Sequence, residues 1–514
     1  MECIKDNPIA EGPFTPAWES LRNYKCPEWF RDAKFGIWSH WGPQSVPMYG
    51  DWYARHMYVE GQPQYLHHWR NYGHPSKHGW KDMVKLWKAE RFNPEGLMKL
   101  YEDAGAKYFV AQAMHHDNFD NWNSKHHAWN AVKTGPKKDI VKLWHDAARK
   151  RGLRFGVTEH LGASYTWFES SKHCDKTGPY AGVPYDGASH DYDDLYHPNR
   201  TEPLSSDKGW QWYTENKEFH EKWFLRIKDL VDQFQPDLLY SDGGLPFLHE
   251  VKYDLPSRQT TIGANRPDVG LNIVAHLYNI SAKLHDGKNE AVYNQKDLRP
   301  EIAAIGVLDI ERGQMNEAKP YVWQTDTCVG GWFYDVRQVY KTPQHVIEML
   351  VDIVSKNGNL LLNFPQRPDG TLDEENLNIL RKLADWTKIN GEGIYGTRPW
   401  ITAGEGPTQV LSQHSSFKED AVPWTTSDFR FTLRQGSGQA GKKNCIYAFQ
   451  MKYPERREAF IRSLGMGFGK KITSVRQLGH DGELSFRQLE DGLLVQLPER
   501  QVCENTPCLK ITSK

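Results

Sequence analysis

The alternation of short apolar runs with helical stretches constrains the fold most, and it extends from about residue 30 to residue 395. This alternation is typical of parallel strands joined by helices. Seven strands are recognisable and one is indistinct, which predicts an α/β fold, a (β/α)8-like TIM barrel. The predicted strands cover residues 35–40, 107–114, 154–160, 237–241, 291–294, 321–324 and 359–364.

Capping residues predict where the intervening helices begin and end. Asn93-Pro94 precedes a helix over 96–104, and Thr342-Pro343 precedes one over 345–356. A third helix, over 139–150, stops before Gly152. A side-chain cap followed by Pro favours a helix start, and Gly favours a helix end. The segment 174–209, rich in Asp, Tyr, Pro and Gly, follows the third strand and is predicted to form part of the active-site mouth.

Beyond the Gly-rich stretch at 390–396 the pattern changes to alternating apolar and polar residues. Segments 443–449 and 492–497 show this alternation, and turn signals at 436–441 and 480–482 separate such segments. We therefore expect a barrel domain over residues 1–395, with an N-terminal extension, and a C-terminal β-sandwich over 396–514.

Composition points to a neutral, polar partner. The net charge of −1 gives no general attraction for nucleic acid or an anionic membrane, and we find no apolar run near the ~20 residues of a membrane span. The chain contains 20 Trp, 24 Tyr and 21 Phe, and such rings suit the C–H faces of sugars. We expect a carbohydrate partner and no cofactor, and the oligomeric state stays open.

Cysteines and the first residues bear on localisation. Seven scattered cysteines, an odd count without metal or redox spacing, favour free thiols. The first eight residues lack the apolar stretch of a signal peptide. We expect either a periplasmic or secreted protein whose signal has been removed, or a cytoplasmic one.

Polar and aromatic residues follow the predicted strands, where a barrel gathers its functional side chains. They include His40, His115, His116, His160 and Asp242. Imidazoles both donate and accept hydrogen bonds, which suits a ligand rich in hydroxyls. Four of these residues, all except His160, could also ligate zinc. The first strand lacks the H-x-H of barrel metallohydrolases and carries Trp38-Ser39-His40 instead, so we expect no metal.

Motifs spanning about residues 28–400 resemble glycoside hydrolase family 29, the α-L-fucosidases. They occur in family order with plausible spacing. They are FGIWSHWGPQSVP (35–47), DWY (51–53), GAKY (105–108), HHD (115–117), WNSK (122–125), PKKD (136–139), PDLLYSDG (236–243), WQT (323–325), GWFY (331–334) and NGNLLLN (357–363).

The resemblance implies a retaining, exo-acting hydrolase that works by double displacement. The family nucleophile, an Asp ending the fourth strand, corresponds to Asp242. Retention needs a second carboxyl about 5–5.5 Å away that donates a proton and then removes one from water. Counting back from Trp323 indicates Glu311 for this acid/base role. Arg312 beside it would lower its pKa if close, so burial must dominate. Asp309, Glu301 and Glu290 remain rivals.

The resemblance also assigns sugar contacts. Those expected to hydrogen-bond the sugar or to form apolar walls are His40, His115, His116, Trp52, Trp38, Tyr240 and Trp332. Further substrate contacts are expected where the chain departs from the family: Asp51 replaces a usual Glu, and Lys296 stands where Arg is common. Gln324 replaces the Glu of a Trp-Glu motif.

A further departure, at the end of the third strand, bears on which sugar is bound. This strand end is usually Tyr-rich in the family, and a Tyr there encloses the C5 methyl group of fucose. Here it reads Thr158-Glu159-His160, and a buried, unpaired carboxylate facing a methyl would cost several kcal/mol. We therefore expect Glu159 and His160 to contact a 6-hydroxyl. The terminal sugar is then α-L-fucose or α-L-galactose, the latter as in algal galactans.

A different class of function remains open: a carbohydrate-binding pseudoenzyme that keeps the His and Trp lining without catalysis. Such a protein would lack one of the carboxyl groups. Asp242 and Glu311 are both present. Turnover of any α-L-glycoside would exclude this alternative.

Overall fold

Eight parallel strands close into a barrel in chain order, which confirms the predicted (β/α)8 architecture. The computed structural model describes residues 2–200, 212–248, 266–410, 418–436 and 444–514. Closure comes from pairing of the last strand with the first, where Trp38 lies opposite Asn363. The barrel strands are β1 (Phe35–Ser39), β2 (Tyr108–Gln112), β3 (Arg154–Glu159), β4 (Leu238–Ser241), β5 (Val292–Gln295), β6 (Val307–Glu311), β7 (Trp323–Cys328) and β8 (Gly358–Asn363).

Two strands differ from the sequence prediction. The indistinct eighth strand is β6, which carries Asp309 and Glu311 on the same side as their register partners Gln324 and Asp326 of β7. Polar residues facing the inside of a barrel weaken the apolar pattern by which a strand is recognised. The strand predicted over 321–324 corresponds to β7, which continues to Cys328.

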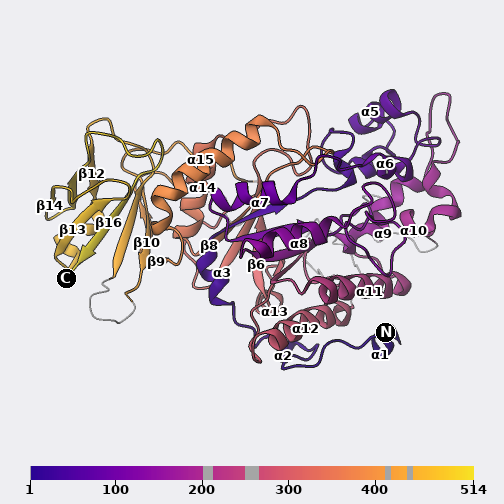
Figure 1. The fold of residues 1–514 in the computed structure, drawn as a ribbon, viewed down its shortest axis with the longest axis horizontal. Helices are drawn as coiled ribbons and strands as arrows, with labels where there is room; N and C mark the ends of the chain where they lie inside the picture. Colours follow the sequence, from indigo (N-terminus) through magenta and orange to yellow (C-terminus); the bar gives the residue numbers. More distant parts are fainter. Residues whose placement is uncertain (1, 201–211, 249–265, 411–417, 437–443) are drawn as a thin grey trace, which may run out of the picture.

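Outer helices cover the barrel (Figure 1). The three predicted helices are present as α7 (Pro94–Asp103), α8 (Ile140–Lys150) and α14 (Pro343–Ser355), and the side chains of Asn93, Asp139 and Thr342 accept the capping hydrogen bonds. These caps satisfy backbone N–H groups that the first turn leaves free. The other long barrel helices are α11 (Lys217–Phe234), α12 (Pro267–Leu284) and α15 (Glu374–Asn390), and the short helices α3 (Glu28–Ala33) and α13 (Pro300–Ala303) precede β1 and β6.

The connections after β1 and β3 carry additional short helices. In Figure 1 they lie at the end of the molecule away from the C-terminal sheets. They are α4 (Tyr53–His56), α5 (Pro63–Tyr72), α6 (Trp80–Leu86), α9 (Ser164–Trp167) and α10 (Asp193–Tyr196). The predicted mouth segment 174–209 includes α10, and its residues 201–209 lie outside the described residues.

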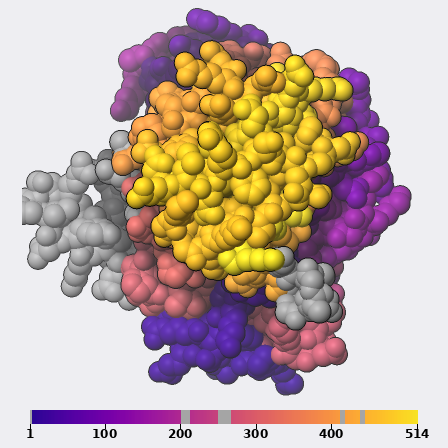
Figure 2. Space-filling model, turned by 90° about the vertical axis from the view of Figure 1, so that its left-hand side faces the viewer, coloured from indigo at the N-terminus to yellow at the C-terminus, as the bar shows by residue number. Residues whose placement is uncertain are grey.

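The C-terminal part forms antiparallel sheets, as predicted. One sheet has the order β13-β16-β11-β10-β9 and the other β12-β15-β14, with an apolar cluster between them. Their residues, yellow in Figure 2, cover one end of the molecule. The strands are β9 (Arg398–Glu405), β10 (Phe429–Arg434), β11 (Cys445–Gln450), β12 (Glu458–Ile461), β13 (Ile472–Gln477), β14 (Phe486–Gln488), β15 (Leu493–Gln496) and β16 (Cys508–Ser513). The boundary at 395/396 stays a prediction.

Remaining elements are short. They are α1 (Glu2–Asp6), α2 (Trp18–Leu21), η1 (Pro43–Ser45), η2 (Leu161–Ala163), η3 (Phe168–Lys172), η4 (Asp186–Ala188), η5 (His190–Tyr192), η6 (Gly391–Gly393), η7 (Arg462–Leu464) and η8 (Met466–Phe468). All seven cysteines are free thiols, as expected. Within the described part of the chain, no helix is both long and apolar enough to cross a membrane.

A buried ion pair holds the loop after β2 against α11. Arg226 of α11 forms a two-point contact with the Asp120 carboxylate, and it also donates to Asn118 Oδ1 at 2.6 Å. The Arg226 side chain is 4% exposed and that of Asp120 is not exposed at all. Because this loop begins with His115 and His116, the ion pair contributes to placing them.

We expect Arg226→Met to lower the free energy of unfolding by about 3–5 kcal/mol, because it leaves the Asp120 charge buried without its partner. Lys228→Met on the same helix is the matched control. It breaks a 2.7 Å pair with Asp232 whose side chains are 18% and 39% exposed, and should cost less than about 1 kcal/mol. Urea unfolding followed by tryptophan fluorescence measures both. Equal losses would contradict a special role for the buried pair.

Candidate functional site

A cavity of about 480 Å³ opens at the carboxyl ends of the barrel strands. Every predicted site residue except Glu159 lines it. Three lining residues were not predicted as site residues. The lining consists of Trp38, His40, Asp51, Trp52, His56, His115, His116, His160, Trp212, Tyr240, Asp242, Lys296, Glu311, Asp326 and Trp332.

At one side of the cavity, Lys296 joins the two predicted catalytic carboxyl groups. Its Nζ lies 2.7 Å from Asp242 Oδ1 and 2.6 Å from Glu311 Oε2. Both oxygens contact the same nitrogen, so the distance between them cannot exceed the sum of these two contacts. That limit lies within the separation of about 5–5.5 Å at which a carboxyl pair supports a covalent glycosyl-enzyme.

The environment gives the two carboxyl groups opposite ionisation tendencies. Burial acts to raise the pKa of Asp242, but the Lys296 charge and a hydrogen bond from His116 hold it well below its usual range. Burial raises the pKa of Glu311 against the opposing effect of Lys296, and the nearby Asp326 and Asp242 raise it further. Asp242 therefore favours the ionised form, whereas Glu311 retains a proton to higher pH than an ordinary Glu.

Arg312 does not pair with Glu311, although it is the next residue. The backbone of Arg312 has φ +48°, and its Nε donates to Glu419 Oε1 at 2.6 Å. Glu419 also accepts from Lys341 at 2.8 Å and from the Thr327 hydroxyl. Because Arg312 forms its ion pair with Glu419, burial rather than Arg312 dominates the pKa of Glu311, which is raised.

The rival acid/base candidates lie away from the cavity wall. Asp309 is buried deeper in the barrel, where it accepts from Gln324 Nε2 at 2.6 Å. Glu290 precedes β5 and pairs with Lys288, so it belongs to the opposite end of that strand. Glu301 is on the short helix α13 before β6. None of the three lines the cavity.

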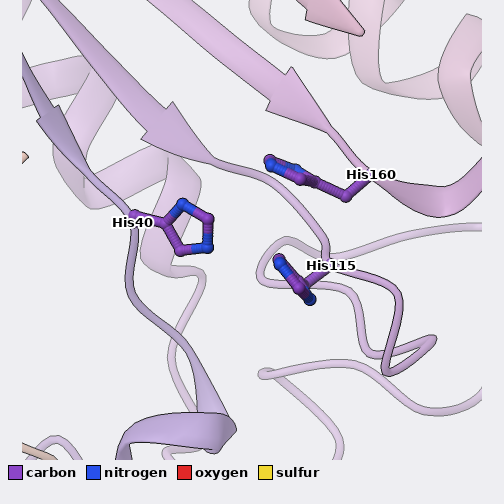
Figure 3. Close-up of side chains that lie close together, drawn as sticks. All are labelled: His40, His115 and His160. Carbon is purple, nitrogen blue, oxygen red and sulfur yellow. The ribbon is translucent and has the colours of Figure 1, made fainter. Parts of the chain in front are cut away.

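Three buried histidines converge at the cavity wall (Figure 3). His40 follows β1, His115 lies beyond β2 and His160 follows β3. Burial lowers the pKa of His160 to about 3 and the pKa values of His40 and His115 well below their usual range. All three imidazoles are therefore neutral at pH 7. They can each offer one donor and one acceptor to a ligand.

The neighbouring part of the cavity is formed by residues around α4. Trp52 has left-handed backbone geometry, φ +56°, and its N–H donates to Asp51 Oδ1 at 2.8 Å. Burial raises the pKa of Asp51 to about 7. The Trp52 ring meets the His116 ring edge to face, with 5.9 Å between ring centres. A partly buried carboxyl beside an indole and an imidazole is well suited to hydroxyl recognition.

The structure corrects the placement of Glu159. Its register partner is Ser241, whereas the preceding Thr158 pairs with the cavity residue Tyr240. Side chains alternate between the two faces of a strand, so Glu159 points outward from the barrel. There its Oε2 accepts from Trp223 Nε1 and from Leu161 N, both at 3.1 Å. Burial raises the pKa of Glu159 to about 7.

His56, Trp212 and Asp326 are the lining residues that sequence reasoning missed. Asp326 would have been found by the same strand-end rule if β7 had been extended to its observed end. His56 follows the DWY motif by three residues and could have been included with it. We find no sequence signal for Trp212, whose indole N–H donates to the Asp242 carbonyl oxygen at 3.3 Å.

A second cavity, of about 530 Å³, lies beside β9. Its basic lining residues Lys356 and Arg430 both pair with Asp352, at 2.6 Å in each case. Burial raises the pKa of Glu348 on the same helix to about 7, but Glu348 is not among the lining residues. The charges of this cavity are thus used in joining α14 to β10, and the convergence of His, Trp and carboxyl groups is found at the strand ends instead.

The family model for α-L-fucosidase matches residues 2–392, and the model for the α-L-fucosidase C-terminal domain matches residues 425–512. The chain belongs to the α-L-fucosidase family. It is therefore a glycosidase, and the sequence resemblance is confirmed. Among α-L-fucosidases, the human plasma enzyme is 28% identical over 519 residues, covering 96% of this chain and 90% of its own. The rat tissue enzyme is also 28% identical, with 96% and 90% coverage.

Solved α-L-fucosidase structures share the fold. That of the Thermotoga maritima enzyme in complex with fucose has a TM-score of 0.70 at 24% identity, covering 97% of this chain and 99% of that one. The structure of a trapped covalent intermediate of the enzyme from Bacteroides thetaiotaomicron has a TM-score of 0.62 at 16% identity, with 95% coverage of both chains.

Proposed function

We propose that this member of the α-L-fucosidase family is an exo-acting, retaining hydrolase that releases a terminal α-L-fucose or α-L-galactose from a glycan. The observation that carries the proposal is the contact of Asp242 and Glu311 with one Lys296 nitrogen at 2.7 and 2.6 Å. This separation accommodates an anomeric carbon between a nucleophile and an acid. A wider gap would instead leave room for a water, as inverting enzymes require.

In the proposed first step, the Asp242 carboxylate attacks the anomeric carbon while Glu311 protonates the departing glycosidic oxygen. In the second step, the ionised Glu311 removes a proton from water, which displaces Asp242 and restores the anomeric configuration. The lowered pKa of Asp242 and the raised pKa of Glu311 support these roles. Trapping of a covalent intermediate in the Bacteroides relative is in keeping with the same chemistry.

A cavity of about 480 Å³ walled by packed aromatic rings supports exo action on one terminal sugar. The Trp38 ring packs against Tyr240 at 5.5 Å and against Trp332 at 5.2 Å between ring centres, and all three rings line the cavity. We assign these rings to the apolar faces of the sugar. We assign the hydroxyls to His40, His115, His116, Asp51 and Trp52, whose polar atoms line the cavity. We propose that the Lys296 ammonium contacts the sugar oxygens nearest the reacting anomeric carbon.

The choice between fucose and galactose now depends on His160 rather than Glu159. His160 lines the cavity, and its Nδ1 is buried without a hydrogen-bond partner among the described residues. A 6-hydroxyl would supply that partner, whereas a methyl group would leave it unmet at a cost of about 1–3 kcal/mol. The withdrawal of Glu159 removes the carboxylate that would have opposed fucose. Both sugars therefore stay within the proposal.

The names of the plasma relatives support action outside the cytoplasm, in the periplasm or after secretion. We include that localisation in the proposal. Export of the full-length gene product, followed by immunoblotting of cell fractions and medium, tests it. Retention in the cytoplasmic fraction would contradict it.

Replacing Glu311 by Gln should separate its acid role from binding. For poor leaving groups we expect a loss of about 10²–10⁴-fold in kcat/KM, because no proton reaches the departing oxygen. Nitrophenyl glycosides, whose leaving group needs little protonation, should be affected far less. The parent enzyme should lose activity as pH rises through the raised pKa of Glu311, and the variant should lose that basic limb. Steady-state kinetics across pH with both substrate types measure this.

Two variants control the experiment. Asp242→Asn should abolish turnover of both substrate types, since the nucleophile serves them equally. Glu290→Gln, at the opposite end of β5, should leave both unchanged. Equal losses for good and poor leaving groups in Glu311→Gln would refute the acid/base assignment.

His160→Phe tests recognition at C6. We expect the ratio of kcat/KM for nitrophenyl α-L-galactoside over the α-L-fucoside to fall at least about tenfold, or about 1.4 kcal/mol, because the variant cannot bond a 6-hydroxyl. Glu159→Gln is the control and should leave the ratio unchanged, since its carboxylate faces Trp223. A fucose preference above about tenfold in the parent enzyme would already exclude the galactoside as its substrate.

A further inference from the structure

The histidine triad, defined as His40, His115 and His160, brings three ring nitrogens close enough together to act as ligands of one ion. One ring nitrogen from each residue lies within 4.8 Å of the others, and all three residues are buried. His40 and His160 directly follow β1 and β3, whereas His115 lies three residues beyond β2 in the loop after that strand (Figure 3). The barrel therefore holds the backbones of two of the three ligands close to rigid strands.

Several of these nitrogens form no hydrogen bond within the described part of the chain. Both ring nitrogens of His40 and the Nδ1 of His160 are buried without a hydrogen-bond partner there. His115 places its Nδ1 2.8 Å from the side-chain amide of Gln44. A buried polar atom without a protein partner can bond to a water, an ion or a ligand, and the convergence of the three imidazoles favours a ligand here.

We propose that the histidine triad binds a divalent transition metal such as Zn²⁺ and that the bound metal blocks the sugar site. Neutral imidazoles are preferred zinc ligands, with Zn–N bonds of about 2.0–2.1 Å, and a fourth position remains open toward the cavity for water. The metal is an inhibitor in this proposal, since it occupies nitrogens assigned to the sugar. The blocking part rests on the proposed function, whereas metal binding does not.

Small adjustments complete the site. Nitrogen atoms around a tetrahedral zinc lie about 3.3 Å apart, so rotation of the three rings must bring them closer by up to about 1.5 Å. Coordination through His115 Nε2 requires its proton to move to Nδ1, with the Gln44 amide turned so that its oxygen accepts that proton's hydrogen bond. This is the arrangement in which an outer partner fixes a metal-bound histidine. No net proton is released, because all three imidazoles start neutral.

Zinc binding is measured by titrating ZnCl₂ into EDTA-treated, reduced protein in a calorimeter. We expect one tight equivalent, weakened at least about 10–100-fold in His160→Phe. His190→Gln, which changes a surface histidine whose side chain is 74% exposed, is the matched control and should bind as the parent does. Co²⁺ added to the parent should give the visible absorption of a four-coordinate site, a readout that does not depend on how any variant folds.

Kinetics then separate the two parts of the proposal. Zn²⁺ should raise KM for a nitrophenyl glycoside without changing kcat, and free L-fucose or L-galactose should weaken zinc binding. Unchanged zinc affinity in His160→Phe, or a Co²⁺ spectrum of octahedral water only, overturns the metal site. Tight zinc binding in a chain that hydrolyses no α-L-glycoside would overturn the proposed function and leave the metal site standing.

A second inference comes from the contacts of Glu419, which belongs to the segment before β10. Glu419 is 7% exposed and holds both Arg312 and Lys341, which follow β6 and β7. The backbone of the same segment joins β6, because Lys418 N donates to the Arg312 carbonyl oxygen at 2.9 Å. The C-terminal part of the chain thus contacts the residue next to Glu311.

We infer that Glu419 is a positioning residue that keeps the Arg312 guanidinium turned away from Glu311. This rests on the acid/base role proposed for Glu311. The other charged groups around Glu311 are Lys296, Asp242 and Asp326, reaching it from β5, β4 and β7. An added cation would stabilise its carboxylate and lower its pKa. Arg312 already interacts electrostatically with Glu311 as well as with Glu419, so loss of the Glu419 charge leaves the attraction of Glu311 unopposed by that ion pair.

Glu419→Gln should therefore move the basic limb of kcat/KM to lower pH, by about 0.5–1 unit. Adding Arg312→Met to this variant should return the limb to the parental pH, because the misplaced cation is gone. Glu392→Gln, which breaks a 2.6 Å pair between η6 and Lys510 of β16, is the control. If Glu419→Gln lowers the stability but leaves the basic limb of kcat/KM at the parental pH, Glu419 is only structural. A basic limb that survives in Glu311→Gln would instead reject the acid/base role itself.

Discussion

The pairing of Lys296 with two carboxyl groups is the interaction on which the site depends. Lys296 follows β5, and β5 lies between the strands that carry Asp242 and Glu311 in the closed barrel. Parallel strands place residues beyond their carboxyl ends side by side, so a cation from the middle strand reaches both neighbours. Without it, two carboxylates at this separation would repel each other and both pKa values would rise. Lysine offers a point charge that can contact both oxygens at once.

Beneath this triplet, the barrel interior continues as a column of buried polar groups. The Tyr240 hydroxyl lies 3.1 Å from Asp326 Oδ2 and 3.4 Å from Asp242 Oδ1. Burial, with the neighbouring Asp326, raises the pKa of Asp309 well above its usual range. Gln324 joins this column, so a Glu there, as in the family motif, would add a third carboxyl to two already buried. The neutral amide accepts from Tyr108 and donates to Asp309, and it avoids that cost.

Much of the site could be predicted because the barrel follows a simple rule. Residues at or just beyond strand ends meet at one face, so the predicted strands alone bring His40, His115, His160 and Asp242 together. The errors have local causes. Strand β6 was indistinct because its polar residues face inward, and this strand carries Glu311. Asp326 was missed because the strand predicted over 321–324 stopped short of the end of β7.

The sequence by itself determined the barrel, the C-terminal sheets and the family, because these depend on periodicity and on motifs that are contiguous in the chain. Only the tertiary structure decided which way individual side chains face. Glu159 points away from the cavity because register with β4 places it beside Ser241. Arg312 turns away from its neighbour Glu311 because Glu419, far along the chain, pairs with it. Pairing between distant segments sets such directions, and a linear pattern contains no record of the partner.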